Sequence, residues 1–249
     1  CSSSNEILMR VLGVIPSRYD SSRFPGKPLI DLDGKSMIRR VYEGVNQSSK
    51  IDKLIVATDD QRIVDEVQSF GGHVMMTSTD HVSGTERCIE VSDNHGDFDI
   101  LINIQGDEPL VDVAQIEQLI DAFNDQSVQI ATLASRNIVI EELSNPNRIK
   151  VVTDAQSNAL YFSRSVIPNN SKQDNIYSYL KHIGLYAFTE HSLTKISSMD
   201  SCEIERLESL EQLRWMFHGE KISVVETSIE TPNIDVPEDV EKVLSLLRK

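Results

Sequence analysis

Near its start the chain reads Val11-Leu12-Gly13-Val14-Ile15-Pro16, and the type of sheet can be predicted from this stretch and from similar ones that follow it. A short apolar run that ends at a proline is typical of a buried strand in a parallel sheet. Similar runs follow at residues 53–58, 73–76 and 100–104, with helix-period segments between them. Strands that alternate with helices at this spacing predict an α/β protein with an open, mostly parallel, Rossmann-like sheet flanked by helices.

The second half of the chain has a less regular pattern. It predicts helices at 114–124, 207–218 and 237–247, and strands at 129–135, 150–153, 182–188 and 222–226. The polar segment at about 163–181 predicts a small insertion that serves for dimer contact or as a lid. We expect one domain over residues 9–249, and we interpret residues 1–8 as a disordered or artificially added terminus.

Composition excludes several classes of protein. The chain has 249 residues, and its net charge of −15 argues against a protein that binds nucleic acid by broad phosphate neutralisation. No apolar stretch approaches the roughly 20 residues that span a bilayer, and the first residues do not resemble a signal peptide. We therefore expect no membrane insertion and a cytoplasmic location. Its three cysteines form no CxxC pair, which argues against a structural zinc site or a disulfide framework.

The loop at residues 16–27 carries three cations, Arg18, Arg23 and Lys27, in an acidic chain. It leaves the first predicted strand at its carboxyl end, where ligands of open α/β sheets bind. Cationic side chains and backbone N–H groups at this position can surround a polyphosphate. The alternative is a solvated, flexible basic loop, but the position after the first strand favours the binding site.

A second loop, Gln105-Gly106-Asp107-Glu108-Pro109, follows the strand predicted at 100–104. A carboxylate there is well placed to hold Mg²⁺ against a triphosphate, so Asp107 is a candidate metal ligand. Asp235 precedes the last predicted helix and is a candidate second ligand. Its alternative role is to cap that helix.

The chain resembles the family of 3-deoxy-manno-octulosonate cytidylyltransferases, the CMP-Kdo synthetases, in the nucleotidyl-sugar transferase superfamily. The resemblance covers nearly the whole chain in nine ordered blocks. These are IPSRYDSSRFPGKPL at 15–29, VATDD at 56–60, DHVSGTER at 80–87, NIQGDEP at 103–109, NPNRIKVV at 145–152, ALYFSR at 159–164, LKHIGLYAF at 180–188, LESLEQLR at 207–214 and NIDVPEDVEKV at 233–243.

This resemblance implies transfer of CMP from CTP to the anomeric hydroxyl of Kdo, giving CMP-Kdo and pyrophosphate for lipopolysaccharide biosynthesis. It implies CTP and Kdo as the substrates, Mg²⁺ as the cofactor and a homodimer. The implied catalytic residues are Lys27, Arg18 and Asp107, and the implied metal ligands are Asp107 and Asp235. The implied nucleotide-binding residues are Pro16, Ser17, Arg18, Arg23, Lys27, Ser83, Gly84, Arg87 and Gln105. The implied sugar-binding residues are Arg164, His182, Tyr186, Glu211 and Gln212.

Ser17 and Asp20 depart from the family pattern, which often has alanine and another small residue there, and we expect Asp20 to face solvent. Three alternative functions stay open. The first is a cytidylyltransferase for another acidic sugar, namely 8-amino-Kdo or a sialic acid. The second is a glycosyltransferase of similar fold, which would normally carry a DxD motif. The third is a non-catalytic regulator that binds CTP without releasing pyrophosphate. Taken without the resemblance, His182, Glu211 and Gln212 would be ordinary half-buried or solvent-facing residues.

Overall fold

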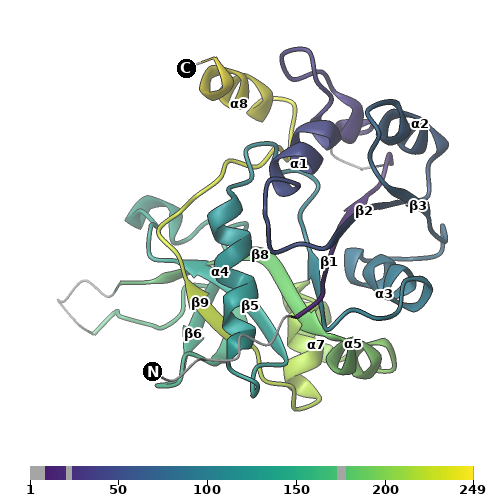
Figure 1. Ribbon diagram of the computed structural model, residues 1–249. Coiled ribbons are helices and arrows are strands. Elements are labelled where there is room, and N and C mark those ends of the chain that lie inside the picture. Colours follow the sequence, from purple (N-terminus) through teal and green to yellow (C-terminus); the bar gives the residue numbers. More distant parts are fainter. Residues whose placement is uncertain (1–8, 21–23, 173–177, 249) are drawn as a thin grey trace, which may run out of the picture.

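The computed structural model describes residues 9–20, 24–172 and 178–248. A twisted sheet forms its centre, with the strand order β3-β2-β1-β4-β8-β5-β9 (Figure 1). The strands are β1 Val11–Ser17, β2 Lys53–Thr58, β3 Val74–Met76, β4 Ile100–Asn103, β5 Ile130–Ser135, β8 Leu180–Thr189 and β9 Ser223–Glu226. Among these, β8 runs antiparallel to its neighbours β4 and β5, and the other described pairings along this path are parallel. The prediction of a mostly parallel sheet is confirmed.

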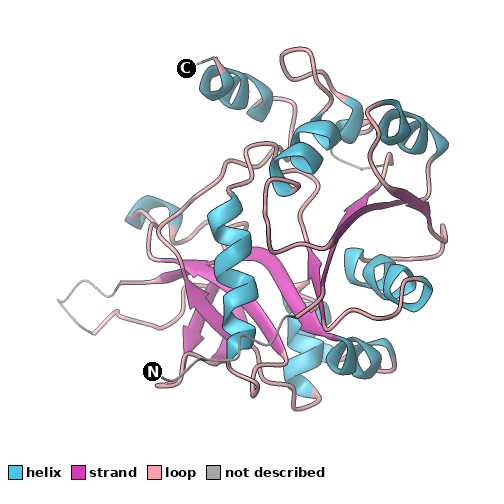
Figure 2. Ribbon diagram, viewed as in Figure 1, coloured by secondary structure: helices cyan, strands magenta, loops and turns pink. Residues whose placement is uncertain are grey.

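Helices pack on the sheet (Figure 2), and an apolar cluster lies against each of its two faces. Ile15 and Val56 point into the cluster formed with helices α1 Met37–Val45, α2 Gln61–Ser69 and α4 Val113–Asp121. Val14 and Ile55 point into the opposite cluster, formed with α3 Gly84–Asn94, α5 Glu190–Ser197 and α7 Gln212–Phe217. Side chains that alternate between two buried faces explain why the strands read as continuous apolar runs.

A third, smaller apolar cluster fastens the C-terminal helix α8 Asp239–Leu247. Val243 of this helix packs with Leu32, Met37 and Ile234, all of which are fully buried. This packing holds residue 234, and with it Asp235, against the segment that follows β1.

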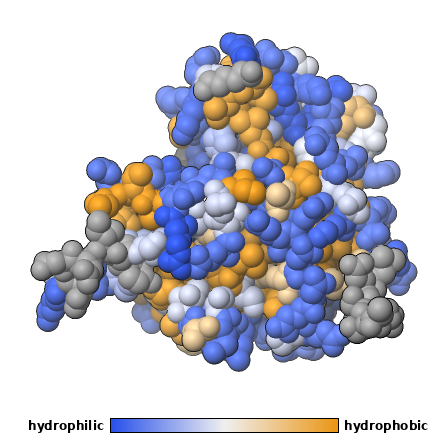
Figure 3. Space-filling view, turned by 60° about the vertical axis from the view of Figure 1, so that its left-hand side comes forward, coloured by the Kyte–Doolittle hydropathy of each residue, from blue (hydrophilic) through white to orange (hydrophobic). Residues whose placement is uncertain are grey.

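Most of the face in Figure 3 carries hydrophilic side chains, with apolar side chains exposed between them.

A β-hairpin belongs to the same sheet but branches from the strand order given above at β8. Its strands β6 Lys150–Thr153 and β7 Ala159–Ser163 are antiparallel, and β6 also pairs with the start of β8. Between β7 and β8 the described residues 164–172 and 178–179 contain no helix or strand. The insertion expected at about 163–181 falls on this connection, and the terminus at 1–8 lies outside the described residues.

One predicted element is wrong. The single helix expected at 207–218 is two helices, α6 Glu203–Glu208 and α7 Gln212–Phe217. Ser209 ends α6 in the left-handed region, with φ 51°. Sequence periodicity gave no sign of this break, because the turn is held by Arg164, which is distant in the sequence. The strand β7 and the helix α5 were not predicted, and the remaining predicted strands are present with small shifts in their ends.

Within the described residues, no helix has the length and apolar character needed to cross a bilayer.

Candidate active site

The candidate site lies where β1 and β4 end side by side. The two strands are parallel neighbours, so Ser17 and Asn103 reach the same edge of the sheet. Because β8 is antiparallel to β4, the chain enters β8 from this edge of the sheet. Tyr186 of β8 pairs directly with Asn103. Two adjoining hollows open here and share Pro16, Arg18, Gln105 and Gly106. They form one cleft with a smaller and a larger compartment.

The smaller compartment, of about 310 Å³, contains the predicted nucleotide-binding residues Ser17, Arg18 and Lys27. Arg18 is exposed, as is Asp20 at the same compartment, which agrees with the expectation that Asp20 faces solvent. The hydroxyl of Ser17 is buried and has no hydrogen-bond partner among the described residues. Arg23 lies outside the described residues.

Two hydrogen bonds hold the ammonium group of Lys27 in this compartment. Its Nζ donates to the Asp107 carboxylate at 3.0 Å and to the carbonyl of Ile234 at 2.8 Å. The backbone N–H of Ile234 in turn donates to the Asp107 carbonyl at 2.9 Å. The Lys27 side chain is 15% exposed and that of Asp107 22%. The pair is therefore partly shielded from water but still accessible to a ligand.

Tyr19 braces the described part of the loop before Lys27. Its carbonyl accepts a hydrogen bond from the N–H of Gly26 at 2.8 Å. The guanidinium of Arg62 stacks on its ring, 3.2 Å from the centroid, and Arg62 also pairs with Asp60. These contacts hold the loop that delivers Lys27 to the cleft.

Asp235 reaches the same neighbourhood through Ile234. Its carboxylate accepts from Asn233 Nδ2 at 2.6 Å, and its N–H donates to Asp239 at 2.9 Å. The residue that precedes α8 is Glu238, so Asp235 is not the N-cap of that helix. The alternative capping role is therefore wrong. Among the described residues, no three His, Cys, Asp or Glu side chains form a metal-binding group. A metal here would need substrate oxygens as further ligands.

The larger compartment, of about 430 Å³, collects residues from distant parts of the chain. A volume of this size suits a small polar ligand. Its lining includes eight residues that were predicted to bind the nucleotide or the sugar, namely Pro16, Gly84, Arg87, Gln105, His182, Tyr186, Glu211 and Gln212. Gln105 is held by a hydrogen bond from its Nε2 to the carbonyl of Gly184 at 2.8 Å.

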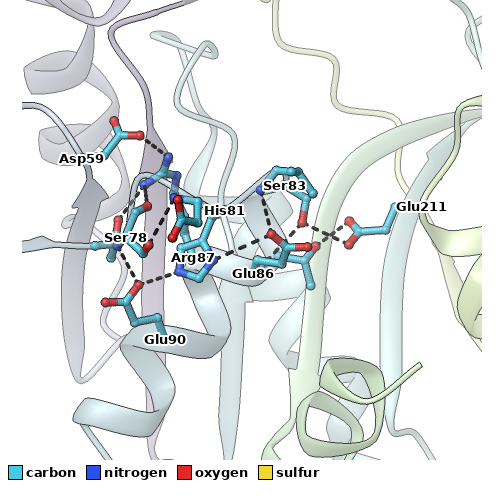
Figure 4. A network of polar contacts seen from close by, with 12 residues as sticks. Asp59, Ser78, His81, Ser83, Glu86, Arg87, Glu90 and Glu211 are labelled. Atoms are coloured by element: carbon cyan, nitrogen blue, oxygen red, sulfur yellow. Dashed lines mark hydrogen bonds and ion pairs between the residues drawn. The ribbon is translucent and has the colours of Figure 1, made fainter. Parts of the chain in front are cut away.

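Glu211 enters this compartment from the turn before α7 and points towards Ser83 at the start of α3 (Figure 4). Its carboxylate accepts from Ser83 Oγ at 3.1 Å and from Thr85 Oγ1 at 2.8 Å. Burial raises the pKa of Glu211, although both hydroxyl contacts oppose that rise. The carboxylate is a fixed acceptor that joins the two helices across the cleft.

Arg87 supports the wall of the cleft from behind. Only 1% of it is exposed. Its guanidinium points away from Glu211 and donates to Asp59 at 2.5 Å, Thr77 at 2.7 Å and the Ser78 carbonyl at 3.2 Å (Figure 4). These contacts favour an ordering role for Arg87 over a direct charge contact with a nucleotide.

An aromatic cluster forms the floor of the larger compartment. The ring centroid of Tyr186 lies 5.3 Å from that of His182 and 5.2 Å from that of Trp215. Burial lowers the pKa of His182 to about 3, so its ring is neutral near pH 7, with Nε2 2.9 Å from Thr132 Oγ1. Burial, helped by the charge of Glu211, raises the pKa of the Tyr186 phenol well above its usual range. The floor is therefore uncharged and offers hydrogen-bonding groups.

Arg164 is not brought into this lining. Its guanidinium donates to the carbonyls of Glu208 at 2.6 Å, Pro146 at 2.9 Å and Ser209 at 3.2 Å. A direct contact between Arg164 and a sugar stays a prediction, and it would require these bonds to rearrange.

Several lining residues were not predicted, among them Asn103, Thr85, Ile149, Leu210 and Trp215. Asn103 and Thr85 belong to quoted blocks and could have been found there. Trp215 is the chain's sole tryptophan, and its buried Nε1 has no hydrogen-bond partner among the described residues. It lies within α7, on the buried side of that helix.

Both the sequence and the fold of this chain resemble those of known proteins. A family model described as Cytidylyltransferase matches residues 12–222. The 3-deoxy-manno-octulosonate cytidylyltransferase of Porphyromonas gingivalis is 48% identical over 247 residues, which cover 96% of each chain. The 8-amino-3,8-dideoxy-manno-octulosonate cytidylyltransferase of Shewanella frigidimarina is 44% identical over 238 residues, with 94% of this chain and 97% of the relative covered. A solved structure of CMP:2-keto-3-deoxy-manno-octonic acid synthetase complexed with CTP superposes with a TM-score of 0.91 at 42% identity, covering 96% of this chain and 98% of the other.

Proposed function

The chain belongs to the cytidylyltransferase family, and we propose that it transfers CMP from CTP to the anomeric hydroxyl of 3-deoxy-D-manno-octulosonate (Kdo). The products are CMP-Kdo and pyrophosphate. The observation that carries this proposal is the near full-length match at 48% identity to a relative of that name, together with the cleft at the carboxyl ends of β1 and β4. The glycosyltransferase and regulator alternatives lack such support.

The reaction joins the anomeric oxygen to the α-phosphorus and breaks the bond from that phosphorus to the bridging oxygen of pyrophosphate. Such a transfer needs in-line positioning and charge neutralisation rather than a covalent protein intermediate. Lys27, tied to Asp107 and Ile234, is placed to neutralise the departing pyrophosphate. Arg18, shared by both compartments, would hold the phosphates between them.

The cytidine end of CTP would contact the wall between β1 and α3. Pro16, Ser17, Ser83, Gly84 and Gln105 are the proposed contacts. Gly106 brings two backbones close together, since a Cβ there would lie 3.0 Å from the Pro16 carbonyl oxygen. Backbone groups at this spacing can read the edge of a base.

The sugar would occupy the floor of the larger compartment. Glu211 is a fixed acceptor for sugar hydroxyls, and the phenol of Tyr186 stays protonated and can donate. The neutral ring of His182 and the side chain of Gln212 add further polar contacts. We also assign a ligand contact to Trp215, because a buried donor without a partner is costly unless a ligand satisfies it.

We propose Mg²⁺ as the cofactor. Asp107 and Asp235 are hard oxygen donors, which suit this ion, and Mg²⁺ typically combines one or two carboxylates with substrate phosphates. The ammonium of Lys27 on Asp107 indicates that this carboxylate attracts a cation. When bound, the ion would neutralise the triphosphate and lower the pKa of the attacking hydroxyl.

The biological setting is also a proposal. CMP-Kdo formation would place the protein in lipopolysaccharide biosynthesis, and CTP is a cytoplasmic nucleotide, which supports the cytoplasm as the location. A homodimer is supported by exposed apolar side chains on and beside the β6–β7 hairpin, where Leu160 is 59% and Leu207 76% exposed. Sedimentation of the purified protein would test the dimer.

A pyrophosphate-release assay with CTP, Mg²⁺ and a panel of acidic sugars tests the function. We expect the highest kcat/KM with Kdo, a lower value with the 8-amino sugar and none with a sialic acid. Preference for the 8-amino sugar would overturn the substrate and keep the reaction class. CTP binding without pyrophosphate release would contradict the proposed enzyme.

A further inference from the structure

Lys150, at the start of β6, is a fully buried lysine outside the residues to which a role has been given above. Its Nζ donates to the carbonyls of Arg148 at 2.6 Å, Arg164 at 2.7 Å and Asn145 at 3.4 Å. An ammonium group has three donors, and here each one has a backbone acceptor. Lys150 thus ties the loop before β6 to the end of β7.

Glu208, at the end of α6, supplies the countercharge. Its carboxylate accepts from Ser163 Oγ at 2.6 Å and from the N–H of Arg164 at 2.9 Å. Burial lowers the pKa of Lys150, and the charge of Glu208 opposes that change. The carboxylate therefore binds the same end of β7 that Lys150 holds through the Arg164 carbonyl.

The guanidinium of Arg164 completes the connection. Its bonds to the carbonyls of Glu208 and Ser209 hold the left-handed turn that ends α6, and its bond to Pro146 returns to the loop before β6. We name Lys150, Arg164 and Glu208 the carbonyl clamp.

Both ends of the carbonyl clamp lead directly into the larger compartment. Ile149, next to Lys150, lines the compartment, and its carbonyl accepts the N–H of His182 at 2.9 Å. At the other end Leu210, Glu211 and Gln212 follow Ser209, and all three line the compartment. Among the described residues, Lys27 and Asp107 form no hydrogen bond or ion pair with the carbonyl clamp.

We infer that Lys150, through Arg164 and Glu208, is a positioning residue that sets the sugar-binding floor of the larger compartment and leaves the smaller compartment, with Lys27 and Asp107, unchanged. This inference rests on the proposed function. Stability alone does not explain a lysine at this place, because well-packed apolar residues are often as stable as buried charges. Buried charges with satisfied hydrogen bonds instead define one geometry, and small displacements of a positioned group are costly in rate.

The test compares Lys150→Met with the wild type in pyrophosphate release, varying the acidic sugar and CTP separately. The sugar is whichever member of the panel the wild type uses. We expect kcat/KM for the sugar to fall on the order of 10- to 100-fold, with the KM for CTP nearly unchanged. Lys242→Met, an exposed lysine on α8, is the matched control and should behave as wild type.

A second variant, Glu208→Gln, keeps the shape of the side chain and removes the countercharge. Glu208→Gln should also lower kcat/KM for the sugar. It replaces Lys150→Met as the test if that variant does not fold. CTP binding by calorimetry and thermal unfolding check both variants without turnover. Unchanged sugar kinetics, or equal losses for CTP and sugar, would overturn the inference. A wild type inactive with Kdo but active with another sugar would instead overturn only the proposed substrate.

Discussion

The ammonium of Lys27 lies 3.0 Å from the carboxylate of Asp107, although 80 positions separate the two residues in the sequence. The parallel pairing of β1 with β4 brings the loops after these strands together, and the Ile234 carbonyl completes the contact. At the carboxyl edge of the sheet, the cation of this pair can neutralise the triphosphate of a nucleotide, and the carboxylate can bind the metal ion of that triphosphate.

Replacing Lys27 by methionine should remove the charge that neutralises the leaving pyrophosphate. We expect kcat/KM for CTP to fall by on the order of 10²- to 10³-fold, the usual loss when a positioned transition-state contact is removed. Initial rates of pyrophosphate release measure it. Lys35→Met, which removes a more exposed lysine paired with Glu43, is the control. Equal rates in the two variants would show that Lys27 has no catalytic role.

Asp107→Asn should raise the Mg²⁺ concentration needed for half-maximal activity and lower the rate by on the order of 10²-fold, because a carboxylate ligand is replaced by a neutral one. Asp235→Asn should act in the same direction. Magnesium titrations at saturating CTP measure both effects, with Asp121→Asn, a surface ion-pair partner of Lys50, as the control.

Chelation with EDTA should stop turnover, and added Mg²⁺ should restore it. Full activity in EDTA would contradict a metal requirement.

Gly106→Ala should weaken CTP binding. The added Cβ would lie 3.0 Å from the Pro16 carbonyl oxygen, and a backbone atom cannot move aside as cheaply as a flexible side chain. The ends of β1 and β4 should separate slightly, so the KM for CTP rises. Gly96→Ala is the matched control, because a Cβ there meets nothing within 4 Å. The prediction fails if both variants show the wild-type KM.

His182 makes a predictable contribution to the pH dependence of stability. Its pKa is about 3 in the folded protein against 6.5 for the free side chain. Between these values the unfolded chain binds a proton that the folded protein does not, so the free energy of unfolding falls as the pH drops from 6.5.

The variant His182→Gln should lose this part of the pH dependence. Between pH 7 and pH 5 the wild type should lose up to about 2 kcal/mol more unfolding free energy than the variant. Urea titrations at the two pH values measure the difference, and other titrating groups are common to both proteins. His191→Gln, at an exposed histidine, should keep the wild-type slope. If His182→Gln keeps the wild-type pH dependence of the unfolding free energy, then the His182 ring of the wild type is protonated in the folded protein.

The apolar runs of the first half allowed much of the fold to be predicted, since strands buried on both faces have a strong signal. The strand at 53–58 was predicted with its observed ends. The direction of β8 was not predicted, because a buried strand has the same apolar pattern in either orientation. The break at Ser209 was missed because it depends on contacts from Arg164, which is distant in the sequence.

Part of the candidate site was predictable because strands that are buried on both faces have a strong signal in the sequence. Lys27 and Asp107 follow strands, so sheet topology places them at one edge. The clustering of Glu211 with Ser83 follows from the tertiary packing of α7 against α3, which local patterns do not contain. Lys150 was missed because a lysine at the start of a strand is usually exposed, and its burial depends on carbonyls from two other segments.

Phosphorus NMR of the wild-type protein with CTP, Kdo and Mg²⁺ tests CMP transfer from CTP to Kdo most directly. We expect the CTP resonances to be replaced by a phosphodiester resonance of CMP-Kdo and by pyrophosphate, in equal amounts. Unchanged CTP, or pyrophosphate accompanied only by free CMP, would contradict it.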